Sequence, residues 1–170
     1  GSRAREKGLA LELRIDENLP WALKGDPVRI RQILLNLTSN AIKFTDSGHV
    51  LISIEVLGRR DDKARLRIAV EDTGVGINPE DVPLVYEPYV QLGQQFQRQL
   101  PGAGLGLTIC RQLVGLMDGS MDLESRPGEG STFWMELTLP VAPENAARVR
   151  PDTRMVKNRR ILVVDSYELS

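Results

Sequence analysis

The chain has 170 residues, of which 41% are hydrophobic and 26% charged, with a formal net charge of −1. This balance is typical of a globular protein with one domain and a little chain left over. It lacks the basic field that nonspecific nucleic-acid binding needs, and no apolar run approaches the ~18 residues of a membrane helix, so we expect neither nucleic acid nor direct membrane contact. One cysteine and one histidine exclude an internal disulfide, a Cys-based zinc site and a multi-histidine metal site.

Hydrophobic periodicity predicts the elements in chain order. Gly1-Ser2 is typical of a cloning remnant and is left out. Alternation predicts strands at residues 9–15, 50–56, 66–70, 120–125 and 132–139, with a charged turn at 58–63 and a second turn at 127–130. Helices are predicted from Asp26, an N-cap followed by proline, to Phe44, and over residues 104–117, with a short helix at 79–85. The glutamine-rich stretch 91–101 predicts a loop.

Each predicted strand has one apolar and one polar face, which suits a sheet covered by helices on one side only. Hairpin-like neighbours favour a mixed, mostly antiparallel sheet. The predicted fold class is therefore α+β, a two-layer sandwich with helices packed on one face of the sheet.

The composition changes after Pro140. Residues 141–158 carry scattered prolines and charges and indicate a linker. Arg159 and Arg160 then precede a short apolar run that ends in Asp165, a pattern typical of a buried parallel strand. We interpret it as the first strand of a second domain, and the alternative is a C-terminal strand of the first domain.

The first long helix carries a polar stripe. At about 100° per residue one narrow strip collects Arg29, Gln32, Asn36, Asn40 and Lys43. Apolar residues lie on both flanks, with Leu35 and Ile42 on one of them, which suits a helix beneath a ligand cleft. Amide oxygens ligate a hard cation and an ammonium meets phosphate oxygens. The alternative is a solvated helix face.

Two glycine clusters follow. Asp72-Thr-Gly74-Val-Gly76 closes a strand, and its glycines would let the backbone approach a flat ligand while the carboxylate accepts a hydrogen bond. The alternative is a turn capped by Asp72. Residues 102–107, with glycines at 102, 104 and 106, open the second long helix and predict an anion site at its N-terminus.

In this order and separation, these motifs resemble the ATP-binding domain of sensor histidine kinases, within the gyrase, chaperone, histidine kinase and mismatch-repair ATPase superfamily. The similarity covers residues 9–140. The matching segments are 31–45 (the N box), 72–76 and 102–107 (the two glycine boxes), 86–91 (the F box, usually with Phe where Tyr86 stands) and 128–133 (a late turn near the adenine).

The resemblance implies ATP and Mg²⁺ as cofactors. Its catalytic residues would be Asn40, which ligates the metal, Asn36, which supports it, and Lys43, which contacts phosphate. The cofactor-binding set would be Asp72 on the adenine amino group, Gly74 and Gly76 beside the base, Thr132 in the late turn, Arg98 in the lid, and Gly102, Gly104, Leu105 and Gly106 around the phosphates.

Residues 160–165 resemble the opening strand of a receiver domain, which implies a hybrid histidine kinase. Receivers usually have a second acid where this chain has Ser166, which puts metal binding by that receiver in question. The implied partners are a histidine-bearing dimerisation domain of the same protein, receiver domains and another sensor kinase. The implied location is the cytoplasmic portion of a membrane-anchored sensor.

Three readings of function stay open. A protein-histidine kinase catalytic domain leads. A hydrolytic ATPase of the superfamily would need a carboxylate where Asn36 stands. A non-catalytic module that regulates another kinase is suggested by Ala103, which replaces a usual small hydroxyl residue. His49 is expected to be a strand-edge residue and not the phosphate acceptor, and Cys110 a core residue of its helix.

Overall fold

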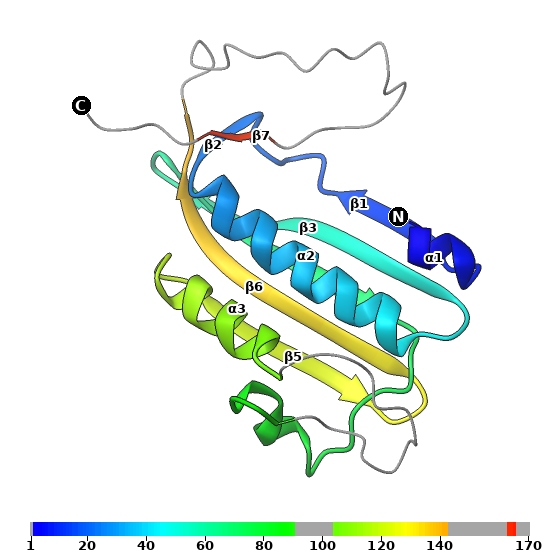
Figure 1. Cartoon of the computed structure of the whole chain (residues 1–170). Coiled ribbons are helices and arrows are strands. Elements are labelled where there is room, and N and C mark those ends of the chain that lie inside the picture. Colours follow the sequence, from blue (N-terminus) through cyan, green and yellow to red (C-terminus); the bar gives the residue numbers. More distant parts are fainter. Residues whose placement is uncertain (1, 91–103, 143–162, 166–170) are drawn as a thin grey trace.

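A computed structural model describes residues 2–90, 104–142 and 163–165 (Figure 1). Its elements, in chain order, are α1 (Ser2–Glu6), β1 (Ala10–Ile15), β2 (Ala22–Lys24), α2 (Pro27–Phe44), β3 (His49–Arg60), β4 (Lys63–Asp72), the 3-10 helix η1 (Val82–Tyr86), α3 (Gly106–Gly115), β5 (Ser120–Arg126), β6 (Gly130–Pro140) and β7 (Val163–Asp165).

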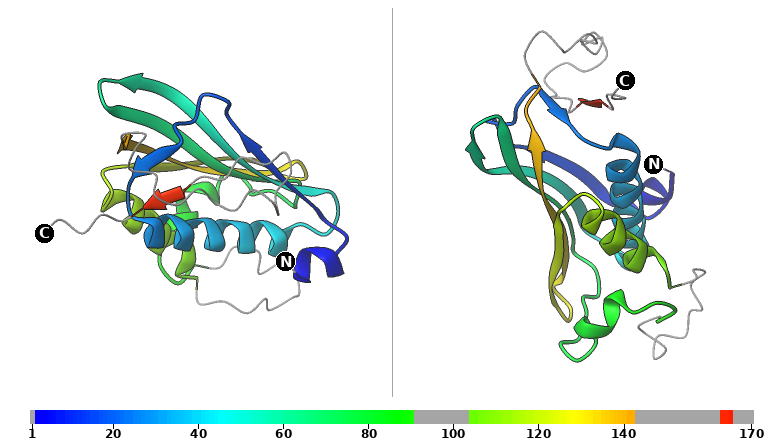
Figure 2. Two further views of the ribbon diagram at one scale, coloured as in Figure 1. Left: turned by 90° about the horizontal axis from the view of Figure 1, so that it is seen from above. Right: turned by 90° about the vertical axis from the view of Figure 1, so that its left-hand side faces the viewer.

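Five strands form one twisted sheet in the order β1-β3-β4-β6-β5. β1 runs parallel to β3, and the other neighbouring pairs are antiparallel. Figure 2 shows α2 and α3 on the same face of this sheet. The predicted α+β two-layer class, with a mixed and mostly antiparallel sheet, is confirmed.

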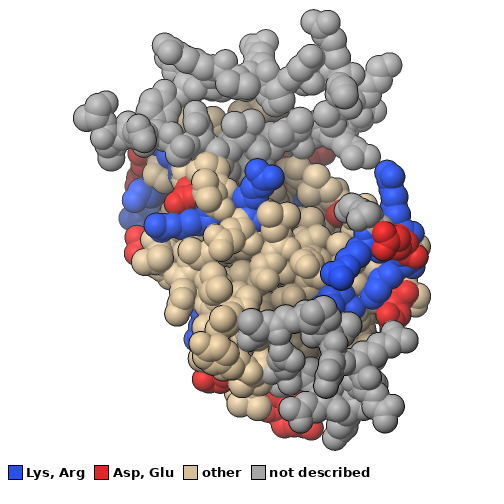
Figure 3. Space-filling model, viewed as in Figure 1, with Lys and Arg blue, Asp and Glu red and all other residues tan. Residues whose placement is uncertain are grey.

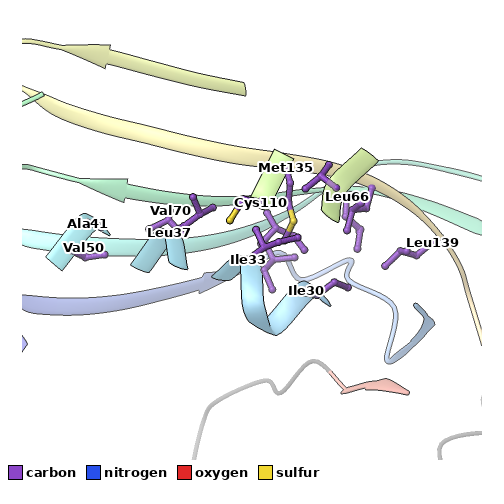
Figure 4. Packing of buried hydrophobic residues seen from close by; sticks show 14 of the residues in the cluster. Ile30, Ile33, Leu37, Ala41, Val50, Leu66, Val70, Cys110, Met135 and Leu139 are labelled. Carbon is purple, nitrogen blue, oxygen red and sulfur yellow. The ribbon is translucent and has the colours of Figure 1, made fainter. Parts of the chain in front are cut away.

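Strand alternation explains where the core sits. On β4 the residues Leu66, Ile68 and Val70 are buried beneath the helices. The helices contribute Ile33 and Leu37 from α2 and Cys110 from α3 (Figure 4). Val114 of α3 belongs to the same core. The apolar stripe of each helix therefore closes over one face of the sheet, and this burial is the main favourable term in the fold.

The opposite face of the sheet is polar but not bare. Glu136 on β6 accepts hydrogen bonds from Arg67 (Nη2–Oε1, 2.8 Å) and Arg65 (Nη2–Oε2, 2.6 Å), both on β4. These two guanidinium groups hold the pKa of Glu136 below its usual value. Arg67 also lies over the Trp134 ring, 5.0 Å from its centroid. Cross-strand pairs thus stabilise this face.

Several predicted boundaries are wrong. Pairing between β3 and β4 continues to Arg60 opposite Lys63, so the expected turn at 58–63 shrinks to Asp61 and Asp62. Asp61 takes a positive φ of 55° there. The second long helix covers only residues 106–115 of the predicted 104–117. α1, which includes Ser2, and β2 are not predicted at all, because five- and three-residue elements hold too few residues for a periodic pattern.

β7 does not join the main sheet. It pairs in parallel with β2, forming a separate two-stranded sheet. The other side of β2 contacts the chain just after β6, where Leu23 bridges to Val141 and the Ala142 N–H bonds the Ala22 carbonyl. Most of the predicted linker and of the segment from residue 159 lie outside the described residues, so the receiver assignment stays a prediction.

Both ends of α2 are held by specific contacts. Asp26 caps the first turn, and its Oδ1 accepts from the Arg29 N–H at 2.9 Å, as the sequence predicts. At the other end Lys7, just after α1, donates from Nζ to the carbonyls of Ile42, Lys43 and Thr45 at 2.8–3.0 Å. An ammonium satisfies carbonyls that a helix end leaves unpaired and meets the negative end of the helix dipole.

Charged side chains gather at this end of the molecule in Figure 3, on the side where α1 meets the end of α2. Lys7 also lies 3.2 Å from Asp46 Oδ1, directly after the helix cap. The N-terminal segment is therefore tied to the end of the helix that carries the polar stripe.

We expect Lys7→Met to lower the free energy of unfolding by about 1–2 kcal/mol, because several carbonyls lose a charged donor. Urea unfolding followed by circular dichroism measures the change. Lys63→Met, at an exposed position on β4, is the matched control and should change stability by less than about 0.5 kcal/mol. Equal effects of the two substitutions would show that the Lys7 contacts contribute nothing specific.

Candidate nucleotide site

The polar side of α2 faces α3 at a close approach. Asn36 donates from Nδ2 to the Cys110 sulfur at 3.1 Å. A Cβ on Gly106, at the start of α3, would lie 2.5 Å from Asn36 Oδ1 and 2.8 Å from Nδ2. Glycine is therefore required at Gly106 for the amide to lie against the first turn of α3.

The predicted stripe divides along the helix. Arg29 forms an ion pair with the capping Asp26 (Nε–Oδ2, 3.0 Å) and Gln32 is exposed, so the N-terminal part serves the helix end and solvent. Asn36, Asn40 and Lys43 are half-buried on successive turns toward the C-terminal end. Leu35, predicted on an apolar flank, is instead 61% exposed, since the helix covers the sheet with its opposite face.

Lys43 lies close to the end of the helix. Its ammonium is 5.0 Å from the centroid of the Phe44 ring, and its carbonyl is one of the acceptors of Lys7. The residue therefore connects the polar stripe to the anchored end of α2.

The second glycine box forms the N-terminus of α3. Gly104 has a positive φ of 67°, and a Cβ there would lie 2.9–3.1 Å from backbone atoms of Tyr89 and Val90. Leu105 is the N-cap and provides no side-chain hydrogen bond to the first turn. Backbone N–H groups at such an end suit an anion. Gly102, Ala103 and Arg98 lie outside the described residues.

The F-box segment is attached to α3. Thr108 donates from Oγ1 to the Tyr86 carbonyl at 2.9 Å, and the Arg111 guanidinium lies 4.9 Å from the Tyr86 ring centroid. The Tyr86 hydroxyl is buried without a hydrogen-bond partner in the described part of the chain, and burial raises its pKa to about 12. The usual Phe at this position would leave no hydroxyl to satisfy.

Asp72 ends β4 and is 7% exposed. Its Oδ1 accepts from the Gly74 N–H at 2.8 Å, so the turn-capping contact is present. Burial raises the pKa of Asp72, while hydrogen bonds from Gly74, Ser131 and Thr45 act against that rise. A carboxylate kept in a buried position at a stability cost is a feature that functional sites often share.

The turn after Asp72 packs tightly against two neighbours. A Cβ on Gly74 would lie 2.5 Å from the Phe44 carbonyl oxygen, and one on Gly76 would collide with the Arg126 carbonyl. The Gly128 N–H bonds the Val75 carbonyl at 2.8 Å. These glycines therefore join the end of α2, the end of β4 and the β5–β6 turn.

The late turn places its two hydroxyl residues on different faces of the sheet. Thr132 pairs in register with Glu71, whereas Ser131 pairs with Asp72. Because neighbouring strand residues point to opposite faces, Ser131 shares the face of Asp72 and Thr132 points to the other. A hollow of about 260 Å³ at the strand ends takes residues from both faces, Glu71, Glu124 and Thr132 as well as Asp72 and Ser131. The family motif alone does not say which of the two adjacent hydroxyl residues shares the face of Asp72. The alternation of side chains along the strand does.

The residue types present fit a Mg²⁺ ion bound through a nucleotide. No three His, Cys, Asp or Glu side chains converge in residues 2–90, 104–142 and 163–165. The half-buried polar groups of the α2 stripe are the amides of Asn36 and Asn40 and the ammonium of Lys43, and the N-terminus of α3 lies beside Asn36. Mg²⁺ commonly takes one or two protein oxygens, substrate phosphates and waters, so this donor set suits a metal–phosphate and not a metal held by protein alone.

The chain matches the family described as Histidine kinase-, DNA gyrase B-, and HSP90-like ATPase over residues 25–142, and it belongs to this family. Its relatives are sensor histidine kinases. It is 38% identical over 167 residues to Sensor histidine kinase GacS of Pseudomonas protegens, covering 98% of this chain and 18% of that protein. It is 44% identical over 133 residues to Sensor histidine kinase RcsC of Escherichia coli, covering 78% and 14%. The chain spans less than a fifth of these relatives.

Solved structures agree with the family. Full-length ShkA in complex with AMPPNP has a TM-score of 0.70 and 36% identity, covering 83% of this chain and 28% of that chain. The catalytic domain of histidine kinase ThkA, nucleotide free, has a TM-score of 0.59 and 27% identity, covering 84% and 86%. Helices long and apolar enough to cross a membrane do not occur in the described part of this chain.

We expect Asp72→Asn to stabilise the ligand-free chain at about pH 7. The raised pKa means that folded Asp72 holds its proton more tightly than unfolded Asp72. Its ionisation therefore lowers the free energy of unfolding as the pH rises through and above the unfolded pKa of about 3.8, and the cost is fully present above the raised folded pKa.

Urea unfolding of wild type and Asp72→Asn between about pH 4 and pH 7 measures this difference. The advantage of the variant should grow with pH. Glu12→Gln, at an exposed position on β1, is the control and should change stability little. A variant that is less stable than wild type by the same amount at every pH would contradict the prediction.

Proposed function

We propose that this chain is the ATP-binding catalytic domain of a hybrid sensor histidine kinase, which binds Mg·ATP and presents the γ-phosphate to a histidine on a separate dimerisation domain. One observation carries the proposal: the Asn36 amide on α2 lies against the uncapped glycine turn of α3, while the buried carboxylate of Asp72 lies beyond the C-terminal end of α2. Family membership and the AMPPNP complex of a 36% identical structure support ATP as the ligand.

At the adenine end, Asp72 would accept a hydrogen bond from the exocyclic amine. Gly74 and Gly76 would border the base, and Ser131, on the same face as Asp72, is added to the set. Residues 126–130 pack against this turn and so hold the edge of the base site.

At the phosphate end, Asn40 would ligate Mg²⁺ and Asn36 would support it. The ion, when bound, neutralises charge on the phosphates. Lys43 would add a point charge, and the N–H groups of Leu105 and Gly106 would approach the terminal phosphates. Phosphoryl transfer needs mostly positioning and charge neutralisation, and these residues provide both.

Transfer to histidine is favoured over hydrolysis. A water-activating carboxylate would have to stand one turn before Asn40, and Asn36 occupies that place. An amide accepts a proton poorly. Four parts of this proposal lie beyond the described residues. They are the acceptor histidine, the receiver domain that would begin at residue 159, a second sensor kinase as partner, and the membrane anchor of the sensor.

Replacing Asn40 by Ala should remove most of the Mg²⁺-dependent part of ATP affinity. Loss of a charge-assisted contact costs about 1.5–3 kcal/mol, roughly ten- to a hundredfold in affinity. Calorimetric titration of a non-hydrolysable ATP analogue, with Mg²⁺ and with EDTA, measures it. Ser39→Ala, an exposed neighbour on α2, is the control. An unchanged Mg²⁺ contribution in Asn40→Ala would exclude this metal site.

Asp72 should select adenine over guanine. An ionised carboxylate accepts but cannot donate, so it attracts the adenine amine and repels the guanine carbonyl. We expect ATP to bind at least about tenfold more tightly than GTP, since a hydrogen bond to a charged group is worth about 1.5–3 kcal/mol.

Asp72→Asn should weaken ATP binding and narrow this gap, because an amide can turn to donate. Titrating both nucleotides into both proteins measures the selectivity. Equal ATP affinity in wild type and the folded variant would leave Asp72 with the turn-capping role alone.

A further inference from the structure

The side chain of Asn36 lies in contact with two parts of α3. Its nitrogen donates to the sulfur of Cys110 at 3.1 Å, one helical turn beyond the glycine turn. Its oxygen lies 2.5 Å from the position that a Cβ of Gly106 would take, closer than its nitrogen at 2.8 Å. The amide plane is thus held between the buried interior of the domain and the N-terminal turn of α3.

An asparagine amide can be turned by about 180° at little intrinsic cost, and the choice depends on its hydrogen-bond partners. Turned one way, Asn36 offers an oxygen to the phosphate end of the site. Turned the other way, it offers an N–H pair, which cannot ligate a cation. Any supporting role toward a metal therefore depends on what holds the nitrogen in place.

We propose that Cys110 is a positioning residue whose sulfur holds the Asn36 amide nitrogen, so that Asn36 Oδ1 faces the glycine turn of α3 and is available to a metal–phosphate. This inference rests on the proposed function for the identity of the ligand. The orientation itself rests on the contacts among Asn36, Cys110 and Gly106.

The surroundings of Cys110 shield this contact from solvent on the core side. The residue is 1% exposed and belongs to the main core cluster, with Ile33 and Met135 among its members. Figure 4 shows it projecting from α3 among these core side chains. Cys110 is shielded from water, so an amide N–H that lost the sulfur would find no partner on the core side. Burial also raises the pKa of the thiol, so the group stays neutral and its sulfur is a weak acceptor.

A matched set of variants separates hydrogen bonding from packing. Cys110→Ser keeps an acceptor in a side chain of similar shape. Cys110→Ala removes the acceptor and leaves a small space. Val114→Ala truncates another buried residue of α3, one turn later, without touching Asn36.

The first measurement is the affinity for a non-hydrolysable ATP analogue with Mg²⁺ and with EDTA, in the full chain. We expect Cys110→Ala to reduce the Mg²⁺-dependent gain about fivefold, the usual effect of losing one hydrogen bond. Cys110→Ser and Val114→Ala should stay within about twofold of wild type, although Val114→Ala loses thermal stability.

The second measurement needs no ligand. The side-chain amide resonances of Asn36, assigned by its loss in Asn36→Asp, should shift and exchange faster with solvent in Cys110→Ala than in wild type or Cys110→Ser. This readout reports the orientation of the amide and would not respond to a general loosening of the core, for which Val114→Ala is the reference.

Three results would overturn the proposal: an unchanged Mg²⁺ contribution in Cys110→Ala, equal losses in Cys110→Ser and Cys110→Ala, or an equal loss in Val114→Ala. If Asn40→Ala abolishes the Mg²⁺ effect while Cys110→Ala does not, the proposed function stands and this inference fails. If wild type gains nothing from Mg²⁺, the proposed function fails, and unchanged amide resonances in Cys110→Ala would then also reject the orienting role.

Discussion

The site depends on how closely α2 and α3 approach each other. Gly106 allows the first turn of α3 to lie against the amide of Asn36, and any larger side chain would displace one of the two. The same approach brings Cys110 within hydrogen-bond distance of that amide. Both helices are held there by their apolar stripes on the sheet, so core packing sets the geometry of polar groups that themselves contribute little to stability.

At the other end of the site, the turn after β4 packs closely against α2 and the β5–β6 hairpin, and this packing lowers the stability of the fold. Gly74 lies against the carbonyl of Phe44, and Gly130 lies against the carbonyl of Asp72. This packing buries the Asp72 carboxylate, and burial raises its pKa. A protein selected for stability alone would replace that carboxylate. A trade of stability for function of this kind is what the proposed binding role of Asp72 requires.

Much of the fold follows from the sequence alone. Period-two alternation predicted every strand of the five-stranded sheet, and Asp26-Pro27 marked the start of α2. The short elements were missed because α1 and β2 are stabilised by neighbours distant in sequence. Lys7 illustrates this, since its acceptors are the carbonyls of residues 42, 43 and 45, and no local pattern pairs a lysine with a helix end so far along the chain.

The sequence by itself determined the class of the protein and pointed to the chemical groups of its candidate site, because motif residues and their spacing are local properties. Only the tertiary structure decided which of them face one another. Strand register placed Ser131, and not Thr132, on the face of Asp72. Helix packing divided the polar stripe, because Arg29 pairs with the N-cap Asp26 while Asn36 donates to the Cys110 sulfur. These choices depend on strand pairing and on contacts between α2 and α3, which bring together residues that are far apart along the chain.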